Sequence, residues 1–404
     1  MRKSIDIIFL WKQADWGFYK RRNEAILFEI SKKNEVGSIL HCEPITIKGI
    51  LFYIYKSLFS RIRKQYSVQI KKALFLKPLK VKNENNIYIT SVIYILGNPK
   101  RLGSIFSSIN DFFVNCQLRI IKKYFQNKSN SLVLIAYPPA LYINNALAIL
   151  NYDFLIADLV DDVIAQTNDE FIKKEYNENY RNILPQCNYI FSTGKSLKQY
   201  ENIARRPIYV LPNGVNFSEF DKKNVENVSV NKERKIAGYV GSINQVMDID
   251  LIEFVIKDNP KVDFIIYGFC HGIGTIYIKK LKKIKNFYYM GPVMYKDVPE
   301  ILSSFDVLIS FKKVKKCIGV DSIKLYEYLA TGKPIVTTSV PPADHFESIV
   351  YIADKPKEFS KCLKKAIGEK DKLIRMERKA IAKNNSWASR GDIIWNKIKE
   401  VIDF

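Results

Sequence analysis

A lysine and a glutamate stand three residues apart in the stretch DSIKLYEYLATGKPIV, which covers residues 321–336. Lys324 and Glu327 would share one face of a helix, because residues three apart are neighbours on a helix surface. Such a pair is often an ordinary surface ion pair of small energetic value. Whether the pair has a further role depends on the rest of the sequence.

Three carboxylates follow an apolar run in FLIADLVDDV. Asp158, Asp161 and Asp162 are predicted to lie at the end of a strand, where clustered carboxylates would raise one another's pKa and favour a general base near neutral pH. One of them could instead cap the next helix, and Asp162 is the best placed to do so. Asp161 is therefore the preferred catalytic candidate, with Asp158 and Asp162 as alternatives.

Two glycine turns follow strand-like runs. Gly241 comes directly after KIAGYV and precedes Ser242; a glycine lets the backbone approach a ligand, and the next amides can hold phosphate, although an ordinary turn fits equally well. The second turn is Pro212-Asn213-Gly214, in which we expect a positive φ at Gly214. Asn213 and Gly214 join two series of elements and are predicted to form a hinge.

Strand-like runs alternate with helix-like runs in two series. The first has SIDIIFL, NIYITSVIYI, LVLIAY, FLIADLV, YIFST and PIYVLP, and the second has KIAGYVGSI, VDFIIYG, FYYMGPV, VLISF and PIVTTSV. This alternation predicts an α/β fold of two Rossmann-like domains with parallel sheets that face a central cleft, where ligands lie at the carboxyl ends of strands. We predict a first domain at residues 1–215, a second domain at 216–385 and a C-terminal helix at 386–404.

The positive charge is concentrated in one part of the chain. The 404 residues carry a net charge of +23, and residues 44–152 hold sixteen Lys or Arg against two acids, a local charge of 16 − 2 = +14. This excess predicts a polyanion or an anionic membrane surface as partner. No nucleic-acid reading motif is recognisable.

The segment 49–80 mixes aromatic and basic residues and has no acid. One interpretation is an amphipathic segment on a membrane surface. The other is a helix that packs on the core and exposes a basic face to water. In the first case the residues at the membrane or acceptor would include Phe52, Tyr53, Arg61, Arg63 and Lys64.

Cysteine, histidine and hydropathy patterns limit the class of protein. The six cysteines form no CxxC pair, which predicts unpaired thiols in a reducing compartment, and the three histidines have no zinc spacing. The most apolar window, SLVLIAYPPALYINNALAIL, is interrupted by Pro and Asn, so a membrane span is not expected. We predict a cytoplasmic protein, peripheral on the inner face of the cell membrane.

Several of these stretches together resemble the GT-B glycosyltransferases, specifically the bacterial family 4-like (group 1) type, which includes teichuronic acid and exopolysaccharide transferases. PNGVNFSEF is similar to the interdomain motif PNGVD-x-x-x-F, and GYVGSI resembles the strand that opens the donor domain. SIKLYEYLATGKPIV resembles K-x-x-E-Y-L-A-x-G-K-P-V-V. NNSWASRGDIIWNKI resembles the helix that crosses back to the first domain.

The resemblance implies roles for the opening pair. Glu327 would bind the nucleotide ribose, Lys324 would lie near the diphosphate, and Val293 would belong to the turn that contacts the base. Gly241 and Ser242 would complete the donor site. The resemblance thus implies an acceptor-binding domain at residues 1–215 and a nucleotide-sugar-binding domain at 216–385. Tyr326 and Tyr328 are expected to pack in the core.

The chain departs from the family pattern at two places. Gly319 stands where retaining members carry a second glutamate, eight residues before Glu327. The usual Arg and Lys after the GYVG strand are also absent, which leaves Lys324, with Lys312 or Lys313, to hold the diphosphate. An inverting reaction with Asp161 as base is therefore at least as well supported as a retaining one.

The predicted function is transfer of a sugar from a nucleotide diphosphate sugar, with UDP as the expected nucleotide, to a lipid-linked or cell-surface polysaccharide acceptor. The resemblance implies no cofactor and no metal. The sequence DID at residues 248–250 matches a metal motif of another transferase fold, but Asp248 fits a helix N-cap better. The alternatives are a sugar-nucleotide epimerase of the same fold and, in another class, a basic nucleic-acid-binding protein.

Overall fold

The computed structural model describes residues 4–13, 15–18, 20–59, 63–75, 77–82, 84, 86–95, 103–126, 130–221, 234–317 and 319–402. The chain forms two compact units. The first unit consists of Met1–Val160, Thr167–Leu211 and Arg390–Phe404, and the second of Asp161–Gln166 and Pro212–Ser389. The domain limits that the sequence suggests, after residues 215 and 385, stay a prediction.

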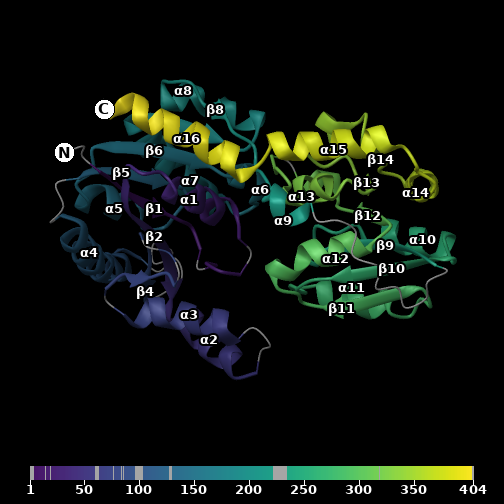
Figure 1. Cartoon of the computed structure of the whole chain (residues 1–404). Coiled ribbons are helices and arrows are strands. Elements are labelled where there is room, and N and C mark those ends of the chain that lie inside the picture. Colours follow the sequence, from purple (N-terminus) through teal and green to yellow (C-terminus); the bar gives the residue numbers. More distant parts are fainter. Residues whose placement is uncertain are drawn as a thin grey trace. The chain divides into compact units, whose positions relative to one another are not determined.

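The first unit is built on an eight-stranded sheet with the order β3-β4-β2-β1-β5-β6-β7-β8 (Figure 1). Only β3 runs antiparallel to its neighbour among the described strands. The strands are β1 (Ile5–Leu10), β2 (Val36–Thr46), β3 (Leu79–Lys80), β4 (Ile87–Tyr94), β5 (Ser131–Ala136), β6 (Phe154–Leu159), β7 (Tyr189–Ser192) and β8 (Tyr209–Val210).

Helices cover this sheet on both faces, as parallel sheets require. They are α1 (Arg22–Ser31), α2 (Ile47–Phe59), α3 (Arg63–Leu74), α4 (Ser104–Gln126), α5 (Ile143–Ile149), α7 (Glu170–Ile183), α8 (Glu201–Ala204) and most of α16 (Trp387–Val401). Helices α2 and α3 lie side by side, and α3 lies next to β4 (Figure 1).

Strand β2 was missed from the sequence, although it is eleven residues long and pairs with both β1 and β4. Its polar residues obscure the strand pattern, because Glu43 and His41 are both fully buried. The Glu43 carboxylate accepts hydrogen bonds from the Lys72 ammonium group of α3 and from the backbone N–H of Trp16. Burial raises the pKa of Glu43 to about 7, although Lys72 lowers it.

The second unit has a six-stranded, fully parallel sheet with the order β11-β10-β9-β12-β13-β14. Its strands are β9 (Lys235–Val240), β10 (Val262–Tyr267), β11 (Phe287–Gly291), β12 (Val307–Ser310), β13 (Ile335–Thr337) and β14 (Tyr351–Ile352). Its helices are α6 (Val163–Gln166), α9 (Phe217–Phe220), α10 (Ile249–Asp258), α11 (Gly274–Leu281), α12 (Val298–Ser304), α13 (Ile323–Thr331), α14 (Pro356–Ile367) and α15 (Lys372–Asn384).

Two helix ends in this unit follow directly from their sequences. Asp248 accepts a hydrogen bond from the Leu251 N–H, so the predicted N-cap of α10 is confirmed. Helix α13 ends at Gly332, whose φ of 72° is the left-handed conformation that glycine adopts without penalty.

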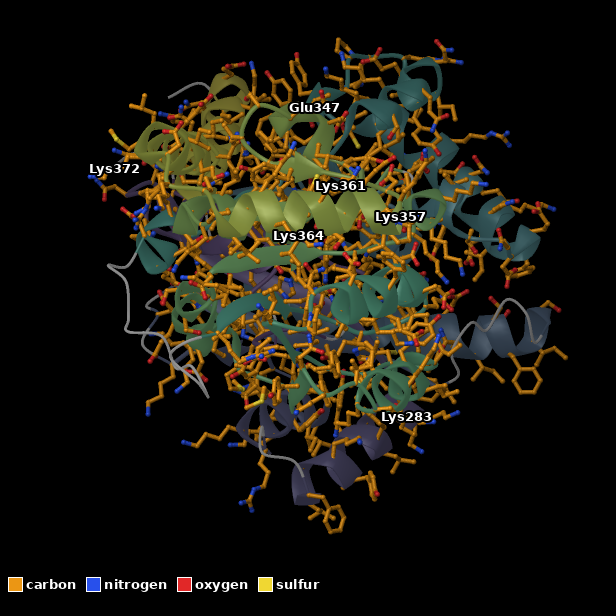
Figure 2. The ribbon with its side chains drawn as sticks, turned by 90° about the vertical axis from the view of Figure 1, so that its right-hand side faces the viewer. Lys283, Glu347, Lys357, Lys361, Lys364 and Lys372 are labelled. Carbon is orange, nitrogen blue, oxygen red and sulfur yellow. The ribbon has the colours of Figure 1, made fainter. Side chains whose placement is uncertain are left out.

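Helix α14 carries lysines on the side that faces water. Figure 2 looks onto this helix, with Lys357, Lys361 and Lys364 along its outer side. The opposite side is apolar, and Phe359 and Leu363 are fully buried. This is the ordinary amphipathic pattern of a helix that packs on a sheet and exposes charge to water.

The predicted α/β fold class is confirmed: two parallel-sheet units are followed by a C-terminal helix that returns to the first unit. In α16, the Glu400 carboxylate accepts the Tyr189 hydroxyl at 2.9 Å. A Cβ at Gly391 would lie 2.7 Å from Glu29 Cβ, so the glycine permits close packing on α1. The arrangement of the two units around a cleft remains a prediction.

Two further sequence predictions concern thiols and membrane spans. All six cysteines lie in the described ranges, and all are free thiols. Among the described residues, no helix has the length and apolar character needed to cross a bilayer.

Candidate functional site

Helix α13 carries both members of the pair identified from the sequence. Glu327 is buried, with 7% of its surface exposed, and Lys324 is half-buried. Burial raises the pKa of the Glu327 carboxyl, while the Lys324 ammonium and the Tyr295 hydroxyl lower it. Burial of a carboxylate and a nearby cation costs desolvation free energy, which their attraction offsets only when the geometry is good and further hydrogen bonds form.

Lys324 reaches from α13 to the turn after β9. A Cβ at Gly241 would lie 2.0 Å from Lys324 Cε and 2.4 Å from its Nζ, so only glycine leaves room for the ammonium there. The Lys324 Nζ also lies 5.8 Å from the centre of the Tyr239 ring. Ser242 contributes its carbonyl, which accepts the Tyr239 hydroxyl at 3.1 Å. The predicted donor residues Gly241, Ser242, Lys324 and Glu327 therefore lie close to one another.

A second lysine lines a small cavity together with Lys324. This cavity also contains Ser310 and Thr337, at the carboxyl ends of β12 and β13, and Ser322 before α13. The Lys312 Nζ lies 3.4 Å from Ser322 Oγ, and burial lowers the pKa of Lys312. Two ammonium groups among hydroxyls at a sheet's carboxyl edge form a suitable environment for phosphate oxygens.

Val293 stands in the turn after β11, half-buried against an apolar cluster that includes Tyr326 and Tyr295. Tyr326 and Tyr328 are 2% and 1% exposed, which confirms that they pack in the core. The described residues hold no group of three or more His, Cys, Asp or Glu side chains that could bind a metal ion.

Asp321 is a buried residue whose importance was not predicted from the sequence. Its carboxylate accepts the Asn213 backbone N–H and the Tyr326 hydroxyl, and its carbonyl accepts the Asn213 side-chain amide at 2.7 Å. Its own N–H donates to Asp161 Oδ1 at 3.3 Å. Asp321 thus connects the predicted hinge, α13 and the candidate base within the second unit.

The prediction of a positive φ at Gly214 was wrong, because Gly214 is not among the positive-φ glycines. The glycine is required for a different reason: a Cβ there would lie 2.7 Å from the carbonyl oxygen of Asn385. Close approach of two backbone segments, rather than turn conformation, excludes a side chain at this position. The Val215 N–H donates to the same Asn385 oxygen at 3.1 Å.

The three candidate catalytic carboxylates have separate partners. Asp158 forms a bidentate ion pair with Arg22 inside the first unit. The distances from the Arg22 nitrogens to the Asp158 carboxylate oxygens are 2.8–3.1 Å. Asp162 accepts the Ala165 N–H at 3.1 Å and thereby caps α6. Asp161 has a φ of 59° and lies near Lys312, which is part of the second unit. Asp158 is thus committed to an ion pair and Asp162 to a helix cap, and the role of Asp161 as base stays a prediction.

The comparisons with known proteins begin with the second unit. Residues 234–369, which hold β9 to α14, match the family model described as glycosyl transferases group 1. This match lies within the second unit, and residues 234–369 are called the group 1 domain after the model that they match. Lys324, Glu327 and Gly241 all lie inside this group 1 domain.

One curated relative and three solved structures illustrate the likeness. The chain is 26% identical over 192 residues to TuaH of Bacillus subtilis (strain 168), whose name describes a glycosyltransferase of teichuronic acid biosynthesis. The match covers 45% of this chain and 48% of TuaH, about half the length of this relative.

The sucrose-phosphate synthase of Thermosynechococcus elongatus is similar over 99% of both chains, with a TM-score of 0.67 and 10% identity. Anabaena HepE in complex with UDP-glucose has a TM-score of 0.62 and 11% identity, over 98% of this chain and 99% of that one. A mutant of S. aureus TarM, in complex with Fondaparinux, alpha-GlcNAc-glycerol and UDP, has a TM-score of 0.56 and 12% identity over both whole chains. At these identities the likeness shows the fold alone, which is that of the GT-B glycosyltransferases.

Outside the group 1 domain, the first unit exposes an unusual amount of apolar surface. None of the residues of α2, all of which the structure describes, is buried. Phe52 is 49% exposed and Phe59 77% exposed, whereas Tyr53 contacts the rings of Phe18 and Tyr66. On α3, Arg63 and Lys64 are exposed, while Arg61 lies outside the described residues.

Helix α4 adds a second exposed apolar face that the sequence analysis did not identify. Its inner side is buried through Val114, Leu118, Ile121 and Phe125. Its first half also has apolar side chains that are 46–74% exposed and share one outer face, because they are related by spacings of three, four, seven or eight residues. These are Ile105, Phe106, Ile109, Phe112 and Phe113. A helix with apolar residues on both sides predicts a second partner for its outer side.

Proposed function

We propose that this chain is a glycosyltransferase that moves a sugar from a nucleoside diphosphate sugar to a lipid-linked or cell-surface polysaccharide acceptor. The observation that carries the proposal is the grouping of Lys324, Glu327 and Gly241 inside the group 1 domain. A nucleoside diphosphate presents a ribose diol and two phosphates. A buried carboxylate matches the diol, and ammonium groups match the phosphates.

Uridine is the proposed base, because the structures of HepE and TarM were solved with UDP-glucose and UDP. Lys312 and Lys324 would stabilise the leaving diphosphate through charge, without a metal ion or other cofactor. Val293 would contact the base from the turn after β11. Asn213 and Gly214 would act as the hinge, held to α13 through Asp321.

Asp161 is the proposed base, which would take the proton of the acceptor hydroxyl in an inverting transfer. The Asp321 N–H donates to its Oδ1 and limits how the carboxylate can turn. A retaining reaction is the alternative. Gly319, in the place of the family's second glutamate, favours the inverting one.

The acceptor would be held by the first unit, and its lipid would place that unit at the membrane. Support comes from the exposed apolar side chains of α2 and α4 and from the charge of +14 in residues 44–152. Both features favour an anionic bilayer surface. The protein would then be cytoplasmic and peripheral on the inner face of the cell membrane.

A nucleotide screen tests the donor assignment. Thermal unfolding should shift upward with UDP or a UDP-sugar, because a ligand at 100 times its Kd stabilises by about 2.7 kcal/mol. Stabilisation by nucleic acid, with none from any nucleotide, would contradict the proposal. Turnover of free sugar nucleotide without an acceptor would identify an epimerase instead.

The Asp161→Asn variant tests the base. The amide cannot take up the proton, so transfer should fall by about a hundredfold or more while UDP binding persists. The Asp162→Asn variant should keep most activity, because an amide oxygen can still cap α6. Near-normal turnover in Asp161→Asn would move the base elsewhere or indicate a retaining reaction.

A further inference from the structure

A polar cavity in the first unit has no role in the donor site described above. It has a volume of about 370 Å³ and lies between β4, α4, α5 and α7. Its walls include Tyr94, the last residue of β4, and Ser107 and Asp111 from the first turns of α4. It therefore opens near the carboxyl edge of the first sheet, where α/β folds place ligands. A volume of this size matches small-molecule sites.

The residues that line the cavity include both hydrogen-bond donors and hydrogen-bond acceptors. Asn145 Nδ2 donates to Asn115 Oδ1 at 3.0 Å and to Asp111 Oδ1 at 3.4 Å, and Asn144 Nδ2 donates to Asn179 at 2.8 Å. These bonds use only part of the donors and acceptors that the amides offer. A hydroxyl group both donates and accepts, so a polyhydroxylated ligand suits such a wall.

The charge of the cavity selects against anions. Asp111 and Glu175 contribute carboxylates, and Glu175 is 6% exposed. Among the described residues that line the cavity, none is a lysine or an arginine. This contrasts with the strongly basic segment around it, so the cavity does not share the purpose of the basic surface. Leu141 and Ile149 add apolar wall that can pack on the C–H face of a sugar ring.

Helix α4 carries both a wall of this cavity and the outer apolar face. Ser107, Asp111 and Asn115 are spaced at i, i+4 and i+8 and line the cavity, while Phe106 and Phe113 belong to the neighbouring exposed face. One helix thus presents a polar, acidic side beside an apolar side. A molecule that joins a sugar to a lipid has the same two parts.

We propose that the cavity between α4 and α5 binds a neutral sugar unit of a lipid-linked acceptor glycan. The proposal rests on the proposed function and specifies where the acceptor lies. Asp111, Asn145 and Glu175 bond the sugar hydroxyls, and the two carboxylates exclude uronic acids and sugar phosphates. The outer face of α4 lies against the lipid.

Saturation-transfer difference NMR on the whole chain tests this directly. The neutral probes are the methyl glycosides of glucose, N-acetylglucosamine and N-acetylgalactosamine, and the anionic probe is methyl glucuronide. At least one neutral probe should give a signal, and methyl glucuronide should give none. The Ser107→Trp variant fills the cavity and should weaken that binding by about tenfold or more, whereas Ser108→Trp, on an exposed neighbouring position, should not.

A second variant guards against misfolding of the first. Asp111→Ala leaves the cavity open but removes a sugar-binding oxygen, and should also weaken the neutral probe by about tenfold. UDP binding is followed by thermal shift in the same samples and should be unchanged in all three variants.

The outcomes separate the two proposals. A wild-type chain that binds UDP but no neutral probe, or binds a probe equally well in Ser107→Trp, would overturn the cavity assignment. Preference for methyl glucuronide or for a small organic cation would overturn it as well. A chain that binds a neutral probe at the cavity but no nucleotide would refute the donor function and leave the cavity as a sugar site.

Discussion

Gly238 and Gly241 lie three residues apart, in β9 and just after it, yet an added methyl group would act differently at each. At Gly238 the methyl would lie 2.0 Å from Cδ2 of Phe305, a ring that is 1% exposed. At Gly241 it would meet the flexible end of Lys324. The first glycine therefore serves packing, and the second leaves space for a cation.

This difference gives a prediction at the residue scale. Gly241→Ala should push the Lys324 ammonium away and weaken UDP binding by about tenfold, or about 1.4 kcal/mol. It should also cost some stability, because the φ of 158° at Gly241 is one that L residues rarely adopt. Gly238→Ala should instead cost about 1–3 kcal/mol of unfolding free energy through overpacking. Urea unfolding and UDP titration of both variants measure the two effects. Unchanged UDP affinity in a folded Gly241→Ala variant, or full stability of Gly238→Ala, would contradict the assignment.

At the scale of elements, a buried ion pair joins the α2–α3 helix pair to the sheet. The Lys72 ammonium of α3 contacts the Glu43 carboxylate of β2, and both side chains are completely buried. Gln69 of α3 also donates to the Trp16 carbonyl at 2.7 Å. Removal of one partner of a buried ion pair is costly, because the other charge is left uncompensated.

Lys72→Met should therefore destabilise the protein by about 3–5 kcal/mol at pH 8.5. The loss should be smaller near pH 5. The folded-state pKa of Glu43 is raised to about 7 from 4.5, so the unpaired carboxyl can be neutral in the folded protein at that pH. The penalty for the lone charge thus grows as pH rises through this window. Urea unfolding at both pH values measures it.

The double variant Lys72→Met, Glu43→Gln serves as the control. It removes the buried charge altogether and should recover part of the stability at pH 8.5. Equal losses at pH 5 and pH 8.5 in the single variant would show that Lys72 contributes packing rather than charge.

The elements also show how far the sequence could predict this fold and site. Runs such as LVLIAY and VDFIIYG became strands β5 and β10, because a continuous apolar run fits a buried parallel strand. Strand β2 escaped prediction because His41 and Glu43 look like surface residues until Lys72, far along the chain, is brought to them. Asp321 was missed for a similar reason, since its value depends on Asn213 and Asp161. Local patterns predict elements, but partners distant in sequence decide which polar residues are buried.

At the scale of the whole molecule, two basic surfaces differ in whether exposed apolar side chains lie beside the basic residues. On α14, Lys357 and Lys361 are exposed above a fully buried apolar side (Figure 2). On the first unit, Arg63 and Lys64 follow a helix whose phenylalanines are exposed. Only the second arrangement offers both charge attraction and apolar contact to a bilayer.

The vesicle prediction compares these surfaces with variants of equal charge change. Arg63→Glu with Lys64→Glu should weaken sedimentation with anionic vesicles by at least roughly thirtyfold, because each lost cation near an anionic leaflet contributes about 1 kcal/mol and the two new carboxylates are repelled. Lys357→Glu with Lys361→Glu should have little effect. Binding of the wild type should also weaken as salt is raised from 0.1 M to 1 M, since the Debye length falls from about 10 Å to about 3 Å.

Equal losses in the two double variants would show that net charge alone drives binding. Binding to neutral vesicles as strong as to anionic ones, or none to either, would leave a solvated basic face as the better explanation of the first unit.

The central claim is that the group 1 domain binds a nucleoside diphosphate through Glu327 and its neighbour Lys324. Calorimetric titration of UDP into the wild type, Glu327→Ala and the exposed control Glu300→Ala tests it most directly. Loss of hydrogen bonds to a charged group costs about 1.5–3 kcal/mol, so Glu327→Ala should bind UDP at least about tenfold more weakly while Glu300→Ala matches the wild type. Unchanged UDP affinity in a folded Glu327→Ala variant would contradict the account.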